Sequence, residues 1–329
     1  MIDIADIILQ AYEMIENDHM DEVYKLLAEV TNEHPESVDK RFQAELKLLM
    51  KLMENRIALK EFGFLRSIAL AYRYCENEYA GAATLSEEEK AACLGLLPEG
   101  DTIWWCWLQG YDNAPEIVKC CYRSLDKLGK KCVILDEANI RYYVTLPDYI
   151  EEKYKAGLIG KAHYADLVRL ELLTTLGGTW IDSTTYISGT AQFGRLLDDE
   201  ELFMYRSGNV SEYIIFDNWL MLAKKKSMIL EATKKMLYSL WQQENKIRHY
   251  FQFHVMMSIA CKLYPEEYGS IPAYSNEPAH ILQYELEKPF DEKRWKQIVA
   301  MSDVHKLTYK IDKQNNEGNY LDYILKQGA

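Results

Sequence analysis

The sequence lacks a long hydrophobic run, an excess of positive charge and a paired-cysteine pattern. No stretch of about 18 apolar residues occurs, so we expect no transmembrane helix. The net charge of −13 argues against nucleic acid as a partner, because binding a phosphate backbone requires clustered cations. The 7 cysteines form no C-x-x-C pair, which argues against a zinc site and a disulfide framework.

The first ten residues, M-I-D-I-A-D-I-I-L-Q, are acidic where a signal peptide would be basic. A P-loop is absent, and so is the G-x-G-x-x-G fingerprint of dinucleotide-binding proteins. Together with the cysteine usage, these features predict a cytoplasmic, reduced protein that does not use an ordinary dinucleotide site.

Two regions with different residue patterns divide the chain. Residues 1–97 are predicted to form an all-helical N-terminal region, because apolar residues such as Ile4, Ile7 and Ile8 recur at helical spacing. Residues 98–329 alternate between strand and helix patterns, with strands at 102–108 and 131–135 around a helix in which Pro115 takes the first position. This βαβ pattern predicts a parallel sheet. Further strands are expected at 201–205 and 213–216, and helices at 227–243 and 250–263.

The segment from Lys161 to Thr185 carries the strongest functional pattern. Asp166 and Arg169 are three residues apart, so they share one face of an otherwise apolar helix. Gly177 and Gly178 can end that helix in a left-handed conformation. The short apolar run that follows predicts a buried strand that ends at Asp182, and ligands of open α/β sheets bind at that edge.

The same segment resembles the sugar-nucleotide site of glycosyltransferases with the GT-A fold. It is most similar to the capsular polysaccharide synthesis proteins and their relatives in glycosyltransferase family 32, which share a pattern of the form A-[SD]-x-x-R followed by G-G-x-[YW]-x-D-x-[DT]. The resemblance implies an α/β fold, with a GT-A-like nucleotide-sugar-binding sheet flanked by helices. The matching residues are Ala165, Asp166, Arg169, Gly177, Gly178, Trp180, Asp182 and Thr184.

The resemblance implies a hexosyltransferase of capsule or surface polysaccharide synthesis. Such an enzyme moves a hexose, with retention, from a UDP- or GDP-sugar to a carbohydrate acceptor that can be lipid-linked, at the inner face of the membrane. An alternative is a non-catalytic module that binds nucleotide or glycan, because Thr184 replaces the second acid of the D-x-D pattern. A glycoside hydrolase is less well supported, because no flanking pair of carboxylates stands out.

The resemblance also assigns roles to individual residues. Asp182, Asp166 and Arg169 would be catalytic, and a divalent cation (Mn²⁺ or Mg²⁺) would be held by Asp182 and His305. Without the resemblance, a lone histidine is more often a core or surface residue, and Asp166 with Arg169 is by default a surface ion pair. The donor nucleotide sugar would contact Asp166, Arg169, Thr184, Lys306, Lys310 and Trp107, the last by stacking on the base.

Two further segments resemble the family and would line the sugar and acceptor pocket. They are F-D-N-W-L-M-L-A at 216–223 and H-Y-F-Q-F-H at 249–254. Taken singly, each is more often structural than catalytic, and Trp107 with its neighbouring tryptophans is equally consistent with core packing. The residues expected in this pocket are His163, Asp217, Asn218, Trp219 and His254.

Overall fold

The computed structural model describes residues 97–208, 213–247, 249–311 and 317–327, together with single residues before position 97. The chain divides into two compact units, residues 1–73 with 247–252 and residues 74–246 with 253–329. The predicted helices of the N-terminal region lie almost entirely outside the described residues. The boundary predicted at residue 97 therefore stays a prediction.

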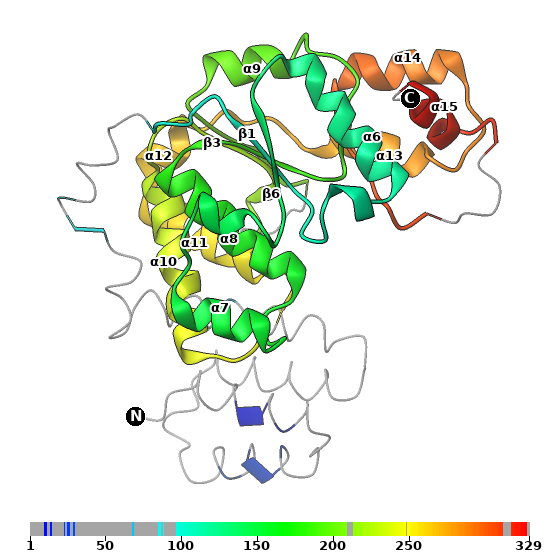
Figure 1. The fold of residues 1–329 in the computed structure, drawn as a ribbon. Helices are drawn as coiled ribbons and strands as arrows, with labels where there is room; N and C mark the ends of the chain where they lie inside the picture. The colour runs from blue at the N-terminus through cyan, green and yellow to red at the C-terminus, as the bar shows by residue number, and fades with distance from the viewer. Residues whose placement is uncertain are drawn as a thin grey trace. The chain divides into compact units, whose positions relative to one another are not determined.

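A five-stranded sheet forms the centre of the second unit (Figure 1). Its strands follow the spatial order β2-β1-β3-β6-β5, in which β1, β2 and β3 are parallel and β6 runs antiparallel to both of its neighbours. The sheet confirms the predicted mixed α/β class and the βαβ unit. The strands are β1 Ile103–Cys106, β2 Cys132–Leu135, β3 Gly178–Asp182, β5 Leu202–Arg206 and β6 Phe216–Ala223.

Helices cover both faces of this sheet (Figure 1). One face packs against α8, which contacts β3, β6 and α10. The helices on this side are α7 Asp148–Lys155, α8 Lys161–Thr175, α10 Met228–Gln243, α11 Gln252–Leu263 and α12 Pro265–Ser270.

The other face packs into a hydrophobic cluster with helices from both ends of the unit. A separate two-stranded sheet, β4 Thr185–Ile187 with β7 Val304–Lys306, lies beside this cluster. The helices on this side are α6 Glu116–Ser124, α9 Phe193–Asp199, α13 Glu277–Glu285, α14 Glu292–Met301 and α15 Tyr320–Gln327.

The structure corrects two details of the element predictions. The strand predicted at 213–216 is wrong, because β6 begins at Phe216 and continues to Ala223, where its backbone pairs with both β3 and β5. Pro115 precedes α6 as its N-cap instead of occupying the first helical position. Its φ of −56° and ψ of 152° are extended, so the helix starts one residue later than predicted.

A tight glycine corner joins α8 to β3, as the sequence predicts. Gly177 and Gly178 have φ angles of 79° and 104°, which residues with a side chain rarely adopt. A Cβ atom on Gly178 would lie 2.4 Å from the carbonyl oxygen of Thr102. The indole of Trp104 donates to the Gly177 carbonyl at 2.6 Å. The corner therefore fixes where β3 starts relative to the helix that carries Asp166.

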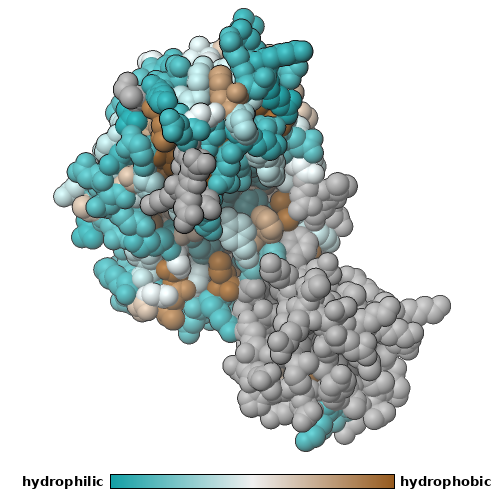
Figure 2. Space-filling model, turned by 90° about the vertical axis from the view of Figure 1, so that its right-hand side faces the viewer, coloured by the Kyte–Doolittle hydropathy of each residue, from teal (hydrophilic) through white to brown (hydrophobic). Residues whose placement is uncertain are grey.

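The surface of the described residues is largely polar. Figure 2 shows one face, on which hydrophilic side chains predominate and hydrophobic ones form separate patches. Within the described part of the chain, none of the helices has both the length and the apolar character needed to cross a bilayer.

Candidate functional site

Asp182 occupies the last position of β3, where its Cα pairs with that of Cys106 at the end of β1. One carboxylate oxygen accepts hydrogen bonds from Arg169 Nη2 and Trp180 Nε1, both at 2.9 Å. The other oxygen accepts from Lys306 Nζ at 2.6 Å. Both oxygens of this acid are therefore engaged by protein donors, two of which are cations.

Arg169 is the centre of the ion pairs. Its side chain is only 4% exposed, and Nη2 lies 3.4 Å from Asp166 Oδ1 as well as 2.9 Å from Asp182. Nη1 donates to the carbonyl oxygen of Asn218, and the guanidinium carbon lies 4.8 Å from the Trp180 ring centre. The Asp166–Arg169 pair is thus buried between α8 and the sheet, so it is not a solvated surface pair.

These four charged side chains, Asp166, Arg169, Asp182 and Lys306, form what we call the ion-pair cluster. Burial alone would raise the pKa of Asp182. The positive charges of Lys306 and Arg169, with the hydrogen bonds from Lys306 and Trp180, outweigh burial and bring the pKa below its ordinary value. Asp182 is therefore ionised at neutral pH, and two acids face two cations within the cluster.

The start of β6 joins the cluster through Asn218, whose side-chain amide donates to Asp166 Oδ1 at 2.9 Å. Its neighbour Asp217 accepts hydrogen bonds from Trp219 Nε1 at 3.1 Å and from the Asn276 side chain. His280 Nε2 lies 3.8 Å from the same Asp217 oxygen. Burial raises the pKa of Asp217, but the bonds from His280, Asn276 and Trp219 lower it more, so this acid is also ionised at neutral pH.

Two predicted histidines border the cluster from α8 and α11. His163 Nδ1 lies 3.4 Å from Asp166 Oδ2, and its ring centre lies 5.5 Å from that of Trp241. His254 is 7% exposed, and burial lowers its pKa although the nearby carboxylates of Asp166 and Asp217 oppose that shift. The contacts therefore bring together the predicted residues at 163, 166, 169, 182, 218 and 306, with His254 near their charges. Asp217 and Trp219 alternate with Asn218 along β6 and contact His280 instead.

His305 and Lys310 are not brought into this group. His305 is fully buried in β7 next to Lys306, and adjacent residues of a strand point to opposite faces. Its Nε2 lies 2.8 Å from Ser188 Oγ. Lys310 is exposed beyond the end of β7, and among the described residues it makes no ion pair with a carboxylate. Their predicted roles have no support from the geometry.

Trp107 and Thr184 lie at the same end of the sheet but outside the cluster. Trp107 is half-buried just beyond β1, with its ring edge-on to Tyr309 at a centroid distance of 5.5 Å. Thr184 is 8% exposed, and its carbonyl oxygen accepts from the backbone N–H of Leu307. Base stacking by Trp107 and donor contact by Thr184 stay predictions.

The residues present do not fit the divalent cation that we predicted from Asp182 and His305. Mg²⁺ and similar hard cations require several oxygen ligands, usually from more than one carboxylate. Within the ranges that the structure describes, no group of three or more histidine, cysteine, aspartate or glutamate residues could hold a metal. Asp182 is already engaged by two cations, and His305 lies on the other face of β7. A metal requirement stays a prediction without a matching ligand set.

Two residues of the site, Asn276 and His280, were not predicted, and Trp180 was predicted only as part of the family pattern, without a role of its own. Trp180 is two residues before Asp182, so strand alternation places its indole on the same face, and this signal was available in the sequence. Asn276 and His280 reach Asp217 because the backbone at Ser275 pairs with Arg206 at the end of β5. Their short segment, N-E-P-A-H, has no pattern that would reveal this contact.

Buried hydrogen-bond donors without partners surround this edge of the sheet. The N–H donors Arg169 Nε and Trp107 Nε1 are buried, as is the ring nitrogen His163 Nε2, and none has a hydrogen-bond partner among the described residues. Leaving a buried donor unpaired costs about 1–3 kcal/mol, so such groups often indicate a ligand. Acceptor oxygens of a bound molecule would satisfy the two N–H groups.

The fold and the position of the cluster define the class of protein. A mixed sheet flanked by helices, with its charged residues at the carboxyl end of the parallel strands, is consistent with a GT-A-like α/β fold. The family model for the capsular polysaccharide synthesis protein matches residues 63–324. The chain therefore belongs to the capsular polysaccharide synthesis protein family, as the sequence pattern predicted. No curated protein matches it.

The buried His305 should make the protein less stable as the pH falls. Burial, with a smaller effect of the Lys127 charge, lowers the pKa of His305 to about 3. Between about pH 6.5 and pH 3, the unfolded chain thus binds a proton that the folded chain does not, and stability falls by about 1.4 kcal/mol per pH unit. From pH 7 to pH 5, wild type should lose about 2 kcal/mol more than His305→Gln, measured by urea unfolding.

The control for this prediction lies in the same titration. Between pH 7 and pH 8 the histidine is neutral in both states, so wild type and His305→Gln should respond to pH equally. Equal slopes between pH 7 and pH 5 would show that residue 305 is accessible to protons in the folded protein. That result would contradict its burial against Ser188.

Proposed function

We propose that the protein is a glycosyltransferase that moves a hexose from a nucleoside diphosphate sugar to a carbohydrate acceptor during polysaccharide synthesis. The observation that carries this proposal is the ion-pair cluster at the carboxyl end of β3, bordered by buried donors without partners. Membership of the capsular polysaccharide synthesis family supports the same substrate class. The hexose, the nucleoside diphosphate and the carbohydrate acceptor are all part of this proposal.

The reaction needs positive charge at the leaving group. The bond between the anomeric carbon and the diphosphate oxygen breaks, a bond to the acceptor oxygen forms, and the acceptor hydroxyl proton passes to the diphosphate. Negative charge therefore develops on the leaving diphosphate, and fixed cations nearby stabilise it. Lys306 and Arg169 are the cations of the cluster, and Lys306 is the more exposed of the two, at 18% against 4%.

Asp182 and Asp166 set the positions of these cations. Two carboxylates already balance Arg169 and Lys306, so a bound diphosphate must compete with Asp182 for the Lys306 ammonium. Arg169 is held from four directions, by Asp166, Asp182, the Asn218 carbonyl and the Trp180 ring, and remains in place. We therefore assign Lys306 to the phosphate and Arg169 to the sugar. Proton transfer to the leaving diphosphate on the same face gives retention at the anomeric carbon.

One observation favours the alternative of a non-catalytic nucleotide- or glycan-binding module. Thr184 stands where the resemblance places a second acid, and Asp182 is saturated by cations. A binding module would hold the nucleotide without releasing the sugar. Binding and turnover therefore have to be measured separately.

Thermal shift with nucleotide sugars tests the donor site. A ligand at about 100 times its dissociation constant adds about 2.7 kcal/mol to the stability of the folded state. We expect a UDP- or GDP-hexose to raise the Tm of wild type and to have little effect on Lys306→Met. Lys296→Met is the matched control, because Lys296 pairs with Glu292 on the surface, where both are more than 70% exposed.

The same thermal-shift experiment distinguishes a metal-free donor site from a metal-dependent one, and a transferase from a binding module. Stabilisation that persists with a chelator would assign the charge neutralisation to Lys306, whereas stabilisation that requires Mn²⁺ would restore the metal prediction. Stabilisation without sugar release would favour the binding module. Absence of a response to every nucleotide sugar would overturn the proposed donor site.

A further inference from the structure

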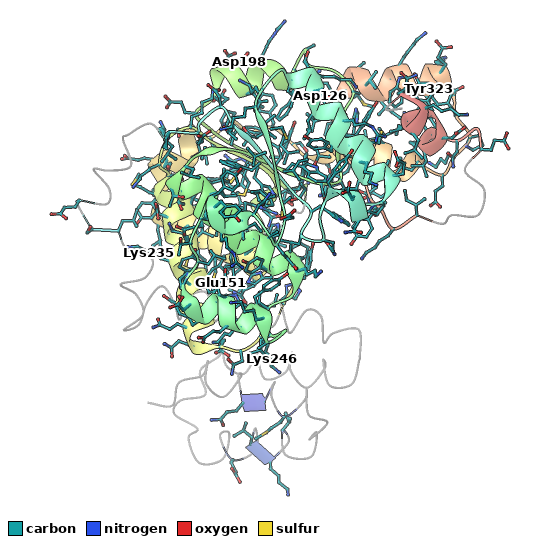
Figure 3. The ribbon with its side chains drawn as sticks, in the orientation of Figure 1. Asp126, Glu151, Asp198, Lys235, Lys246 and Tyr323 are labelled. Atoms are coloured by element: carbon teal, nitrogen blue, oxygen red, sulfur yellow. The ribbon has the colours of Figure 1, made fainter. Side chains whose placement is uncertain are left out.

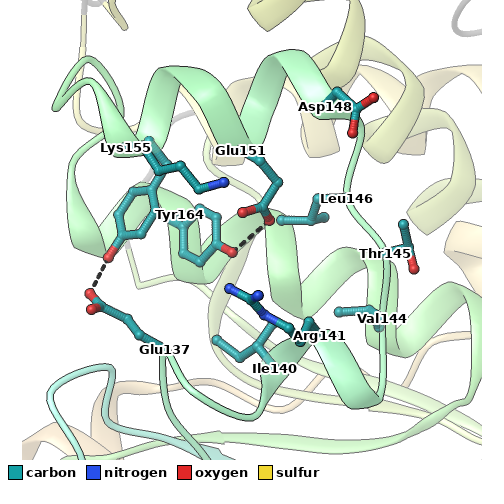
Figure 4. Close-up of a pocket in the computed structure, with 11 residues that line it drawn as sticks. Glu137, Ile140, Arg141, Val144, Thr145, Leu146, Asp148, Glu151, Lys155 and Tyr164 are labelled. Carbon is teal, nitrogen blue, oxygen red and sulfur yellow. Dashed lines mark hydrogen bonds between the residues drawn. The ribbon is translucent and has the colours of Figure 1, made fainter.

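A pocket of about 410 Å³ lies between the segment after β2, helix α7 and the first turn of α8 (Figure 4). Its volume is within the roughly 300–1,000 Å³ of small-molecule sites. Figure 3 places Glu151, one of its lining residues, on α7. We call it the α7 pocket, and the side chains that matter for its chemistry are Glu137, Arg141, Glu151, Tyr154, Lys155 and Tyr164.

The α7 pocket is close to the ion-pair cluster in the fold but chemically separate from it. Helix α8 carries Tyr164 in the pocket and Asp166 in the cluster, and residues two apart on a helix face different sides. Glu137 follows β2, whose last residue, Leu135, pairs with Cys106 of β1. Cys106 in turn pairs with Asp182. The α7 pocket and the ion-pair cluster therefore both lie at the edge of the sheet where β1, β2 and β3 end.

The acids of the α7 pocket are partly engaged, and its cations are not. Tyr164 donates its hydroxyl to Glu151 Oε1 at 2.8 Å, and Tyr154 donates to Glu137 Oε1 at 2.5 Å. Arg141 and Lys155 make no ion pair or side-chain hydrogen bond within the described part of the chain. Figure 4 shows the Arg141 guanidinium directed toward Tyr164 and Glu151.

The tyrosine hydroxyls stay protonated and keep these acids in place. Burial, followed by the hydrogen bond to Glu151, raises the pKa of Tyr164. The rings of Tyr154 and Tyr164 stack at a centroid distance of 3.8 Å, which holds both side chains against each other. One oxygen of Glu151 accepts from Tyr164, and its other oxygen and the Arg141 guanidinium are left for a ligand.

The charge of the lining selects the class of ligand. Three acids, Glu137, Asp148 and Glu151, and two cations, Arg141 and Lys155, line the α7 pocket, and a third cation, Lys161, lies with its Nζ 3.6 Å from Glu137 Oε1. The acids and cations are therefore equal in number, and a lining without net positive charge suits a neutral ligand better than a phosphate or the donor diphosphate. Sugar hydroxyls both donate to carboxylates and accept from a guanidinium, and tyrosine rings provide apolar surface for the ring of a sugar.

We propose that the α7 pocket binds a neutral sugar residue of the carbohydrate acceptor through Glu151 and Arg141. The identity of that sugar as an acceptor rests on the proposed transferase function, whereas its binding to the pocket does not. The pocket then holds the acceptor beside the helix that supplies Asp166 and Arg169 to the donor.

Ligand-observed NMR on the full chain tests the proposal without requiring turnover. The probes are the methyl glycosides of glucose, galactose and mannose, with lactose as a disaccharide. We expect at least one probe to bind wild type, and Arg141→Met and Glu151→Gln each to weaken it about tenfold or more, the loss of one charge-assisted hydrogen bond. Arg141 is exposed, so its replacement leaves the fold intact.

Nucleotide binding by the same variants separates the two proposals. UDP and GDP should bind both variants as they bind wild type, and should not displace the glycoside. Glycoside binding without any nucleotide binding would keep the α7 pocket and overturn the transferase. Displacement of the glycoside by UDP, equal affinity in the variants, or no binding of any probe to wild type would overturn the pocket assignment.

Discussion

A variant with Asp182→Asn is expected to transfer sugar at least about a hundredfold more slowly than wild type, since loss of one preorganised electrostatic group costs about 10²–10³ in rate. Asparagine keeps an oxygen that can accept from Arg169 and Trp180, but it loses the charge that holds Lys306. Without that charge, Lys306 pairs with the diphosphate of the bound donor as strongly as it does at the transition state. Lys306 then no longer stabilises the transition state more than the bound donor. The loss should therefore appear in kcat more than in KM.

The measurement is release of the free nucleotide diphosphate from the donor that the thermal shift identifies. Asp198→Asn is the matched control, because Asp198 forms a surface ion pair with Lys130 at 2.9 Å and is 69% exposed. We expect the control to keep the wild-type rate. Wild-type turnover by Asp182→Asn would remove this carboxylate from the catalytic machinery and leave Asp166 as the acid to test.

The second large effect concerns stability. Arg169→Met should lower the free energy of unfolding by about 3 kcal/mol, because it leaves two partly buried carboxylates, Asp166 and Asp182, without their shared cation, although Asp182 keeps Lys306. The Asn218 carbonyl also loses its donor, and the Trp180 ring loses a cation. Urea unfolding followed by tryptophan fluorescence measures the change.

Two further variants show whether the stability lost in Arg169→Met comes from its ion pairs. Arg123→Met removes a surface pair whose acid, Glu116, is 60% exposed, and should cost less than about 1 kcal/mol. The double variant Arg169→Met with Asp182→Asn should be more stable than the sum of the single changes predicts, because the second change removes an unpaired charge. Strict additivity would show that Arg169 contributes through packing alone.

The region that the sequence predicts best is one in which neighbours along the chain are also neighbours in space. Asp166, Arg169, the glycine corner and Asp182 follow one another within a single helix–strand unit, so periodicity and turn chemistry place them correctly. The strands β1, β2 and β5 are short apolar runs bounded by turn residues, and they were found for the same reason.

Sequence reasoning was least successful where backbone pairing between distant segments decides the structure. The start of β6 was misplaced because residues 213–215 are as apolar and aromatic as a strand, and only pairing with β3 and β5 selects Phe216–Ala223. The tail resembles the family at both His305 and Lys306, but strand alternation allows only one of these neighbours to face Asp182. The register with β4 makes it the lysine.

The two ion pairs of Asp182 close chain segments of very different length. Arg169 is 13 residues away along the chain, whereas Lys306 is 124 residues away. Loop-closure entropy grows with the logarithm of that separation, which makes the Lys306 contact about 2 kcal/mol more costly to close. We therefore expect the carboxylate to meet its arginine early in folding and its lysine late, so that the cluster carries one uncompensated negative charge until the strand at Val304–Lys306 docks on β4.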